Sequence, residues 1–277
     1  YSIIYKTSVI VKASWELDML ANPRPSFLRL PNRPVKPRNS GLTHVLDKGC
    51  TLMTTRQVVA QVADYIDIWK FGWGTSYLDP AVHTKVVELR AAGIRACTGG
   101  TLLELAWSQG AAEEMFQFAS AMGFDCVEVS DGAVEIPSQD KRALISRARE
   151  YGFEVIAEVG SKDPEKRASP EAWLEEIEGD VTAGANWIVA EGRESGTVGL
   201  YEGSGEIRLS LFDDLENSAY AGKIIYEAPQ RAQQTFLLRH LGPGANLGNI
   251  LIDEVLGLET LRLGLRADTL GLMTQFE

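Results

Sequence analysis

The sequence predicts a closed (β/α)8 barrel, and three observations lead to this fold class. Short apolar runs alternate with helical segments along residues 41–277, as strand–helix units do. Gly93, Gly123, Gly152 and Gly184 each end a helix and precede a strand, and their spacings of 30, 29 and 32 residues match the roughly 30 residues of one unit. Charged or polar residues follow most of the apolar runs, as they do at the carboxyl ends of barrel strands.

The elements follow in chain order. Apolar runs rich in β-branched and aromatic residues predict strands at residues 42–46, 65–71, 94–97, 124–129, 153–159, 187–190, 223–226 and 245–250. Helices are expected to end near residues 63, 92, 122, 151 and 183, to begin again at Pro229, and to finish with 253–266. Thr54 or Thr55 is expected to cap the first helix, and Ser169 to cap the helix that begins at Pro170.

Residues 197–209 carry three glycines and are long for a strand–helix loop. They are expected to form either a lid or a hairpin insertion.

Composition excludes several classes of function. The net charge of −11 disfavours a nucleic-acid or membrane-surface partner, although a local cluster of basic residues can still bind an anionic substrate. The three cysteines at positions 50, 97 and 126 have no CxxC spacing, so they indicate neither a disulfide framework nor a zinc site but a reducing, cytoplasmic setting. No apolar run approaches the roughly 20 residues of a membrane span.

Residues 1–40 differ from the rest and are expected to form a proline-rich amino-terminal arm on a catalytic barrel domain at 41–277. Prolines, which favour extended chain, alternate there with basic residues between positions 23 and 38. The arm either crosses the body or a neighbouring subunit, or binds an anion through its basic residues. The expected assembly is a homo-oligomer.

The predicted site consists of charged residues at strand ends. No Ser-His-Asp or Cys-His arrangement is visible. Carboxylates together with lysines and arginines are suited to binding a hard metal ion and an anionic substrate. Each candidate also has a structural interpretation. Asp47 and Asp131 can cap turns, and Glu128, Glu158 and Glu227 can pair with Lys48 or Lys70. Residues 98–101 can seat a phosphate on backbone N–H groups or form a tight turn.

The chain resembles the phosphosulfolactate synthase family. The motifs that carry this resemblance are VLDKG at 45–49, YIDIWKFGWGTS at 65–76, GGTL at 99–102, GFDCVEVSDG at 123–132, EVG at 158–160, EGRESG at 191–196, EAPQ at 227–230, and NLGNI, DEV and LETLR between 246 and 262. They keep their order over about residues 42 to 270. Ser161 departs from the pattern, because a basic residue is usual there.

The resemblance implies a (β/α)8 barrel that catalyses the magnesium-dependent addition of sulfite to phosphoenolpyruvate, giving (2R)-phospho-3-sulfolactate for coenzyme M biosynthesis. On this hypothesis Glu158, Glu191 and Asp131 hold Mg²⁺, and Lys162 donates a proton to the substrate. Lys48, Lys70 and Arg193 hold sulfite, carboxylate and phosphate, and Lys48 or Lys70 is the acid if Lys162 points to solvent. The further substrate-binding candidates are Gly99, Gly100, Thr101, Gln230, Asn246 and Asn249. The further site candidates are Asp47, Glu128, Glu194 and Glu227.

Two alternatives remain open at this point. A related barrel lyase could add a different nucleophile to a phosphorylated three-carbon acid, and a non-catalytic barrel could act as a scaffold through its arm. We expect Asp47, Lys70, Glu158, Glu191 and Glu227 to share one pocket at the carboxyl end of the strands.

Overall fold

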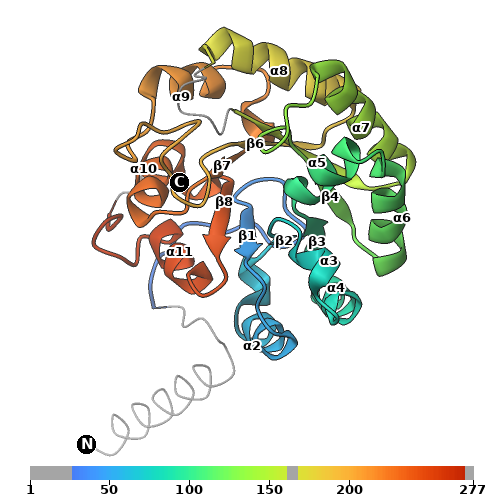
Figure 1. The fold of residues 1–277 in the computed structure, drawn as a ribbon. Coiled ribbons are helices and arrows are strands. Elements are labelled where there is room, and N and C mark those ends of the chain that lie inside the picture. The colour runs from blue at the N-terminus through green and yellow to red at the C-terminus, as the bar shows by residue number, and fades with distance from the viewer. Residues whose placement is uncertain (1–26, 161–167, 272–277) are drawn as a thin grey trace, which may run out of the picture.

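The computed structural model describes residues 27–160 and 168–271, which form a closed barrel of parallel strands in chain order (Figure 1). This confirms the predicted (β/α)8 fold class. The strands are β1 (Thr43–Asp47), β2 (Ile68–Phe71), β3 (Arg95–Thr98), β4 (Cys126–Val129), β5 (Glu154–Val159), β6 (Trp187–Ala190), β7 (Ile224–Glu227) and β8 (Leu247–Leu251). Each strand lies within or beside a predicted apolar run.

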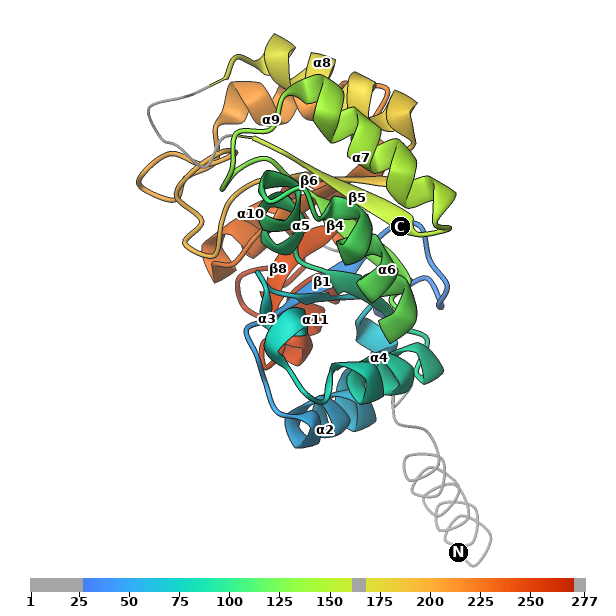
Figure 2. The same ribbon diagram turned by 45° about the vertical axis from the view of Figure 1, so that its right-hand side comes forward.

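Helices surround the strands, as the turned view in Figure 2 shows. They are α2 (Leu52–Val62), α3 (Thr75–Leu78), α4 (Val82–Ala91), α5 (Gly100–Ser108), α6 (Ala112–Met122), α7 (Ser138–Glu150), α8 (Pro170–Ala183), α9 (Leu209–Glu216), α10 (Arg231–Leu241) and α11 (Val255–Arg262). None of the helices in residues 27–160 and 168–271 has the length and apolar character needed to cross a bilayer.

Several helix boundaries differ from the prediction. The single helix expected up to residue 122 is two helices, because Gly110 takes a left-handed φ of 71° between α5 and α6. Thr51, not Thr54 or Thr55, caps α2 and accepts a hydrogen bond from the Thr54 amide. Helix α10 begins two residues after Pro229. Helices α3 and α9 were not predicted, because each is too short for a clear apolar period.

The predicted glycine and capping signals are confirmed elsewhere. Gly93, Gly123, Gly152 and Gly184 have φ values between 68° and 119°, in the left-handed region that ends helices at glycine. Ser169 caps α8 with Pro170 in the first turn.

Residues 197–209 contain a hairpin rather than an open loop. Tyr201 and Ile207 form an antiparallel bridge, and the Tyr201 hydroxyl donates to the backbone oxygen of Glu227. Leu200 and Tyr201 are buried, so this segment is packed onto the end of β7.

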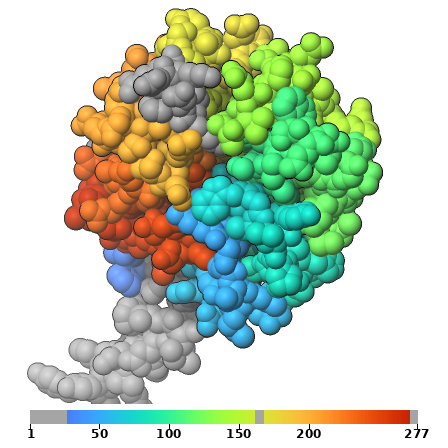
Figure 3. Space-filling view, viewed as in Figure 1, coloured from blue at the N-terminus to red at the C-terminus, as the bar shows by residue number. Residues whose placement is uncertain are grey.

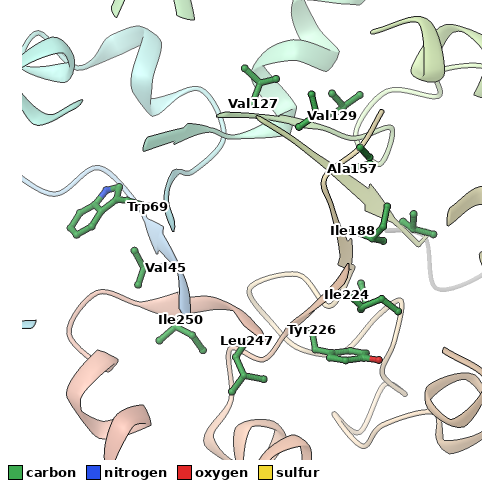
Figure 4. Close-up of a cluster of buried hydrophobic side chains, with 14 of the residues drawn as sticks. Val45, Trp69, Val127, Val129, Ala157, Ile188, Ile224, Tyr226, Leu247 and Ile250 are labelled. Atoms are coloured by element: carbon green, nitrogen blue, oxygen red, sulfur yellow. The ribbon is translucent and has the colours of Figure 1, made fainter. Parts of the chain in front are cut away.

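The barrel strands are apolar on both faces. Outward-pointing side chains such as Val45, Trp69 and Ile250 pack between the strands and the helices (Figure 4). A second cluster fills the barrel interior and consists of Leu42, Ile68, Cys97, Cys126, Ile156, Trp187, Val189 and Ile225. Side chains alternate between the two faces of a strand, so the residue two positions after each interior residue also faces the barrel axis.

The described part of the arm, residues 27–40, lies across the amino end of the barrel (Figure 1). The Arg33 guanidinium is 3.1 Å from Glu259 in α11, and Arg38 is 2.9 Å from Asp67 just before β2. Both ion pairs are buried. Arg33 and Arg38 therefore pair with the body of the protein.

Lys36 in this arm gives a pH-dependent prediction. Its ammonium group donates to the backbone oxygens of Ala63 and Ile66 at 3.1 and 2.6 Å, and burial lowers its pKa from 10.5 to about 8. Between pH 8 and pH 10.5 the Lys36 side chain is protonated in the unfolded chain and largely deprotonated in the folded chain. Lys36 therefore makes the free energy of unfolding rise with pH in this range.

We therefore expect the stability of the wild type, relative to Lys36→Met, to increase from pH 8 to pH 10. Urea unfolding at several pH values measures this difference, because other titrating groups are common to both proteins. A constant or falling difference would contradict the assignment.

Candidate active site

The charged residues of the site continue the interior faces of five strands. Lys70, Glu128, Glu158, Glu191 and Glu227 each stand two positions after an interior apolar residue, which are in turn Ile68, Cys126, Ile156, Val189 and Ile225. The period of two therefore turns all five toward the barrel axis. They are 1–5% exposed.

These residues line a pocket of about 360 Å³ at the carboxyl end of the strands. Figure 3 shows this face, where segments from the beginning, middle and end of the chain meet around the centre. The predicted residues that line it are Lys70, Gly100, Thr101, Glu128, Glu158, Glu191, Arg193, Glu194, Glu227 and Asn249. Of the five residues expected to share one pocket, four do so, and Asp47 does not.

Asp47 has a structural role instead. Its carboxylate accepts hydrogen bonds from the Gly49 and Cys50 amides at 2.8 and 2.7 Å and from the Trp69 indole at 3.1 Å. Asp47 stands two positions after Val45, which points outward, so the alternation of side chains along β1 directs Asp47 away from the barrel axis.

Three glutamates converge in the pocket. Carboxylate oxygens of Glu158, Glu191 and Glu227 lie within 4.8 Å of one another. The predicted metal set combined the first two with Asp131, but Asp131 lies 3.7 Å from Lys141 on the outer side of β4. The structure thus replaces Asp131 by Glu227 in the cluster. Oxygen-rich, negatively charged clusters of this kind suit Mg²⁺.

Lys70 lies between two of the acidic residues. Its ammonium group is 2.9 Å from Glu128 and 3.3 Å from Glu227. Burial disfavours the Lys70 cation, but the carboxylates of Glu128, Glu227 and Glu158 outweigh this effect and raise its pKa well above the ordinary value. Lys70 therefore remains a fixed cation at neutral pH and is a poor proton donor.

The turn before α5 does not offer free N–H groups at every predicted position. The Gly99 amide donates to the Phe71 oxygen at 2.9 Å, and the Gly100 amide donates to Glu128 at 2.9 Å. A Cβ atom at Gly100 would lie only 3.2 Å from the Glu128 carboxylate and closer still to Ser130, so glycine permits this approach. Of the GGTL residues, Gly100 and Thr101 line the pocket, and Gly99 does not.

The loop after β6 supplies the rim. Arg193 is exposed, lines the pocket and has a left-handed φ of 56°, with its amide donating to Glu191. Lys48 is 2.8 Å from Glu194, and both side chains are about half exposed. Lys48 thus belongs to the edge of the site and not to its buried part.

Two residues predicted to hold phosphate have other partners. Asn246 lies at the amino end of β8. Its side-chain oxygen accepts a hydrogen bond from the Leu42 amide at 3.0 Å, and its side-chain nitrogen donates to the Ile224 oxygen at 3.1 Å. Gln230 caps α10 together with Gln233 and donates to the Ser195 oxygen at 2.5 Å. Neither lines the pocket. Lys162, the predicted acid, lies outside the described residues.

Asn249 reaches the pocket through an irregularity of β8. The register between β1 and β8 shifts by one residue between the pairs Thr43–Leu247 and Val45–Ile250, which is a β-bulge. Asn249 takes a left-handed φ of 53° there, and its amide oxygen is buried without a hydrogen-bond partner among the described residues. Bulges near active sites re-aim side chains, and this one adds Asn249 to the lining.

Trp73 is a pocket residue that was not among the predicted site residues. It lines the pocket, is 44% exposed and has a φ of 53°, an unusual backbone for a bulky residue. Arg193 and Asn249 are the other non-glycine residues with positive φ in the described chain. All three residues line the same pocket. The GWG sequence after β2 was the available signal, because flanking glycines allow a sharp turn.

Comparison with known proteins places this geometry in a family. The chain matches the (2R)-phospho-3-sulfolactate synthase (ComA) family over residues 31–268. It is 42% identical over 246 residues to the phosphosulfolactate synthase of Methanothermobacter thermautotrophicus, covering 87% of this chain and 95% of that protein. It is 40% identical over 245 residues to that of Bacillus subtilis, covering 87% and 97%.

Solved structures share the fold at much lower identity. The 3-hexulose-6-phosphate synthase of Salmonella typhimurium superposes with a TM-score of 0.53 and 15% identity, over 85% of this chain and 100% of that chain. The dihydrodipicolinate synthase of Agrobacterium tumefaciens gives 0.52 and 12%, over 85% and 77%. These likenesses show the barrel alone, whereas the sequence matches span the strands that build the pocket. The chain therefore belongs to the (2R)-phospho-3-sulfolactate synthase family.

Proposed function

We propose that this lyase adds sulfite to phosphoenolpyruvate with the help of Mg²⁺ and forms (2R)-phospho-3-sulfolactate. The observation that carries the proposal is the buried trio Glu158, Glu191 and Glu227 beside Lys70 in one pocket. The family match supports the reaction, and the trio supports the metal.

The charge of the pocket favours a divalent cation. The described residues of its lining include two basic residues, Lys70 and Arg193, and five glutamates, a formal net charge of −3 for this described part. Two anionic substrates would be repelled by this balance unless positive charge were added. The three glutamates offer oxygen ligands for Mg²⁺, which would supply positive charge where negative charge develops on the substrate carboxylate.

The reaction requires anion binding, one bond-forming step and one proton. The sulfur lone pair of sulfite attacks C3 of phosphoenolpyruvate, the C2–C3 π electrons move toward the carboxylate, and a proton then adds to C2. Lys70 holds an anionic group at the base of the pocket, and Arg193 holds another at its rim, where a guanidinium can make two parallel hydrogen bonds. The Asn249 amide orients the substrate.

For the proton donor we propose Lys162, because it follows the end of β5 by three residues in the sequence and a lysine pKa falls readily near other cations. The pKa of Lys70 is raised, which makes Lys70 a weak alternative.

A turnover assay tests this function directly. The protein with Mg²⁺ and phosphoenolpyruvate should consume phosphoenolpyruvate only when sulfite is present, and mass spectrometry should detect the adduct with phosphate retained. Consumption without sulfite would indicate a different nucleophile, and no consumption with either would contradict the proposal.

We also propose that the protein is a cytoplasmic homo-oligomer that serves coenzyme M biosynthesis or a related use of the sulfonate. The free cysteines Cys50, Cys97 and Cys126 fit a reducing compartment. The exposed apolar side chains of Tyr77 and Leu78 fit a subunit contact.

A further inference from the structure

Lys141 connects the outer side of the barrel to the glutamate trio. It lies in α7, is 1% exposed, and its ammonium group donates to the backbone oxygen of Glu158 at 2.7 Å and to Glu176 at 2.6 Å. The carboxylates of Asp180 and Asp131 are 3.1 and 3.7 Å away. One ammonium group thus joins the end of β5 to the β4–α7 loop and to α8.

The position of Glu158 in the sheet explains why this contact matters. The pairing of β4 with β5 ends at Val129 and Ala157, so Glu158 lies beyond the last paired residue of β4. On its other side Glu158 pairs with Val189 of β6. A backbone oxygen at a buried strand end requires a donor, and Lys141 supplies one where β4 has ended.

Lys141 is suited to a fixed role. Burial disfavours its charged form, but the carboxylates of Glu176, Asp180 and Asp131 outweigh burial and raise its pKa above the ordinary value. It therefore keeps a full ammonium group, whose three N–H donors are directed at nearby oxygens. Since these three carboxylates outnumber its single charge, Lys141 adds no net repulsion toward a cation in the pocket.

We propose that Lys141 is a positioning residue for the divalent cation site, because it fixes the strand end from which the Glu158 carboxylate meets Glu191 and Glu227. This inference rests on the proposed magnesium site. Groups that orient metal ligands without touching the metal typically contribute about 10- to 100-fold in affinity. Lys141 acts through the backbone of the ligand residue, and its loss would let β5 shift at that residue.

Calorimetric titration of the full chain with Mg²⁺ measures the effect without turnover. Lys141→Met is expected to raise the Kd for Mg²⁺ about tenfold or more. Lys85→Met is the matched control. Lys85 is a buried lysine of α4 that is 2.6 Å from Asp79 and donates to the backbone oxygen of Cys50. It thus contacts the loops after β1 and β2, whereas the trio comes from β5, β6 and β7. This control should lose stability while its Kd for Mg²⁺ stays unchanged.

Lys141→Met leaves the buried Asp180 carboxylate without the ammonium group that lies 3.1 Å away, which can prevent folding. The double variant Lys141→Met/Asp180→Leu removes the pair together and is expected to fold, as circular dichroism would check, and still to bind Mg²⁺ weakly. Asp180→Asn retains Lys141 and its bond to Glu158 and should bind Mg²⁺ like the wild type.

The outcomes separate this inference from the proposed function. If the wild type binds Mg²⁺ and a folded variant lacking Lys141 binds it with the same Kd, the positioning role is overturned and the metal site stands. If the wild type binds no Mg²⁺, both are overturned.

Discussion

Glutamine in place of Glu227 is expected to weaken Mg²⁺ binding and to lower turnover by about a thousandfold. The substitution removes one of three converging carboxylates while preserving the size of the side chain. A catalytic metal contributes several kcal/mol to the stabilisation of transition-state charge, and about 4 kcal/mol corresponds to about a thousandfold in rate. Treatment of the wild type with EDTA should cause a comparable loss that excess Mg²⁺ reverses.

Asp131→Asn is the matched comparison, because Asp131 belongs to the ligand set predicted from the sequence. In the structure its carboxylate lies 3.7 Å from the Lys141 ammonium group and outside the glutamate trio, so this variant should retain most of its Mg²⁺ affinity. Steady-state rates and calorimetry with Mg²⁺ decide between the two sets. Full activity in EDTA would argue against metal dependence, and a larger loss in Asp131→Asn than in Glu227→Gln would favour the sequence-based set.

Lys70→Met is expected to lower the free energy of unfolding much more than the substitution of an exposed lysine. It would leave the buried carboxylates of Glu128 and Glu227, now 2.9 and 3.3 Å from the ammonium group, without their cation. Breaking a buried ion pair by removing one partner typically costs about 3–5 kcal/mol. Urea denaturation measures this change in the free energy of unfolding.

Lys48→Met provides the comparison at the surface. Its ion pair with Glu194 is as short, at 2.8 Å, but both side chains are about half exposed. Water screens such a pair, so its loss should cost less than about 1 kcal/mol. Equal losses in the two variants would show that burial does not determine the strength of the Lys70 pairs.

The sequence alone determined the fold class and the elements of the barrel. Apolar runs separated by units of about 30 residues predict strand–helix repeats because each unit must bury one strand and one helix face. Gly93 and Gly123 mark helix ends because only glycine adopts left-handed backbone without strain, and both do so here. These signals are local in the sequence, so they can be interpreted without knowing which segments lie next to each other in space.

The sequence also placed charged residues at the carboxyl end of the sheet, and most of those predicted line the pocket there. It did not determine which of them face the barrel axis. Parallel barrel strands are apolar on both sides, so the pattern does not reveal which alternate positions point inward. Asp47 and Glu227 both end apolar strands, yet Glu227 continues the interior face and Asp47 the exterior one.

Tertiary structure decided the composition of the site. Asn246 and Asn249 differ by three positions, but a bulge in β8 turns Asn249 into the pocket while Asn246 stays at the opposite end of the strand. Lys141 gains its role because β4 ends one residue before Glu158 would pair with it. Register and strand length arise from contacts between segments far apart in the chain, and for that reason they cannot be read from any one of those segments.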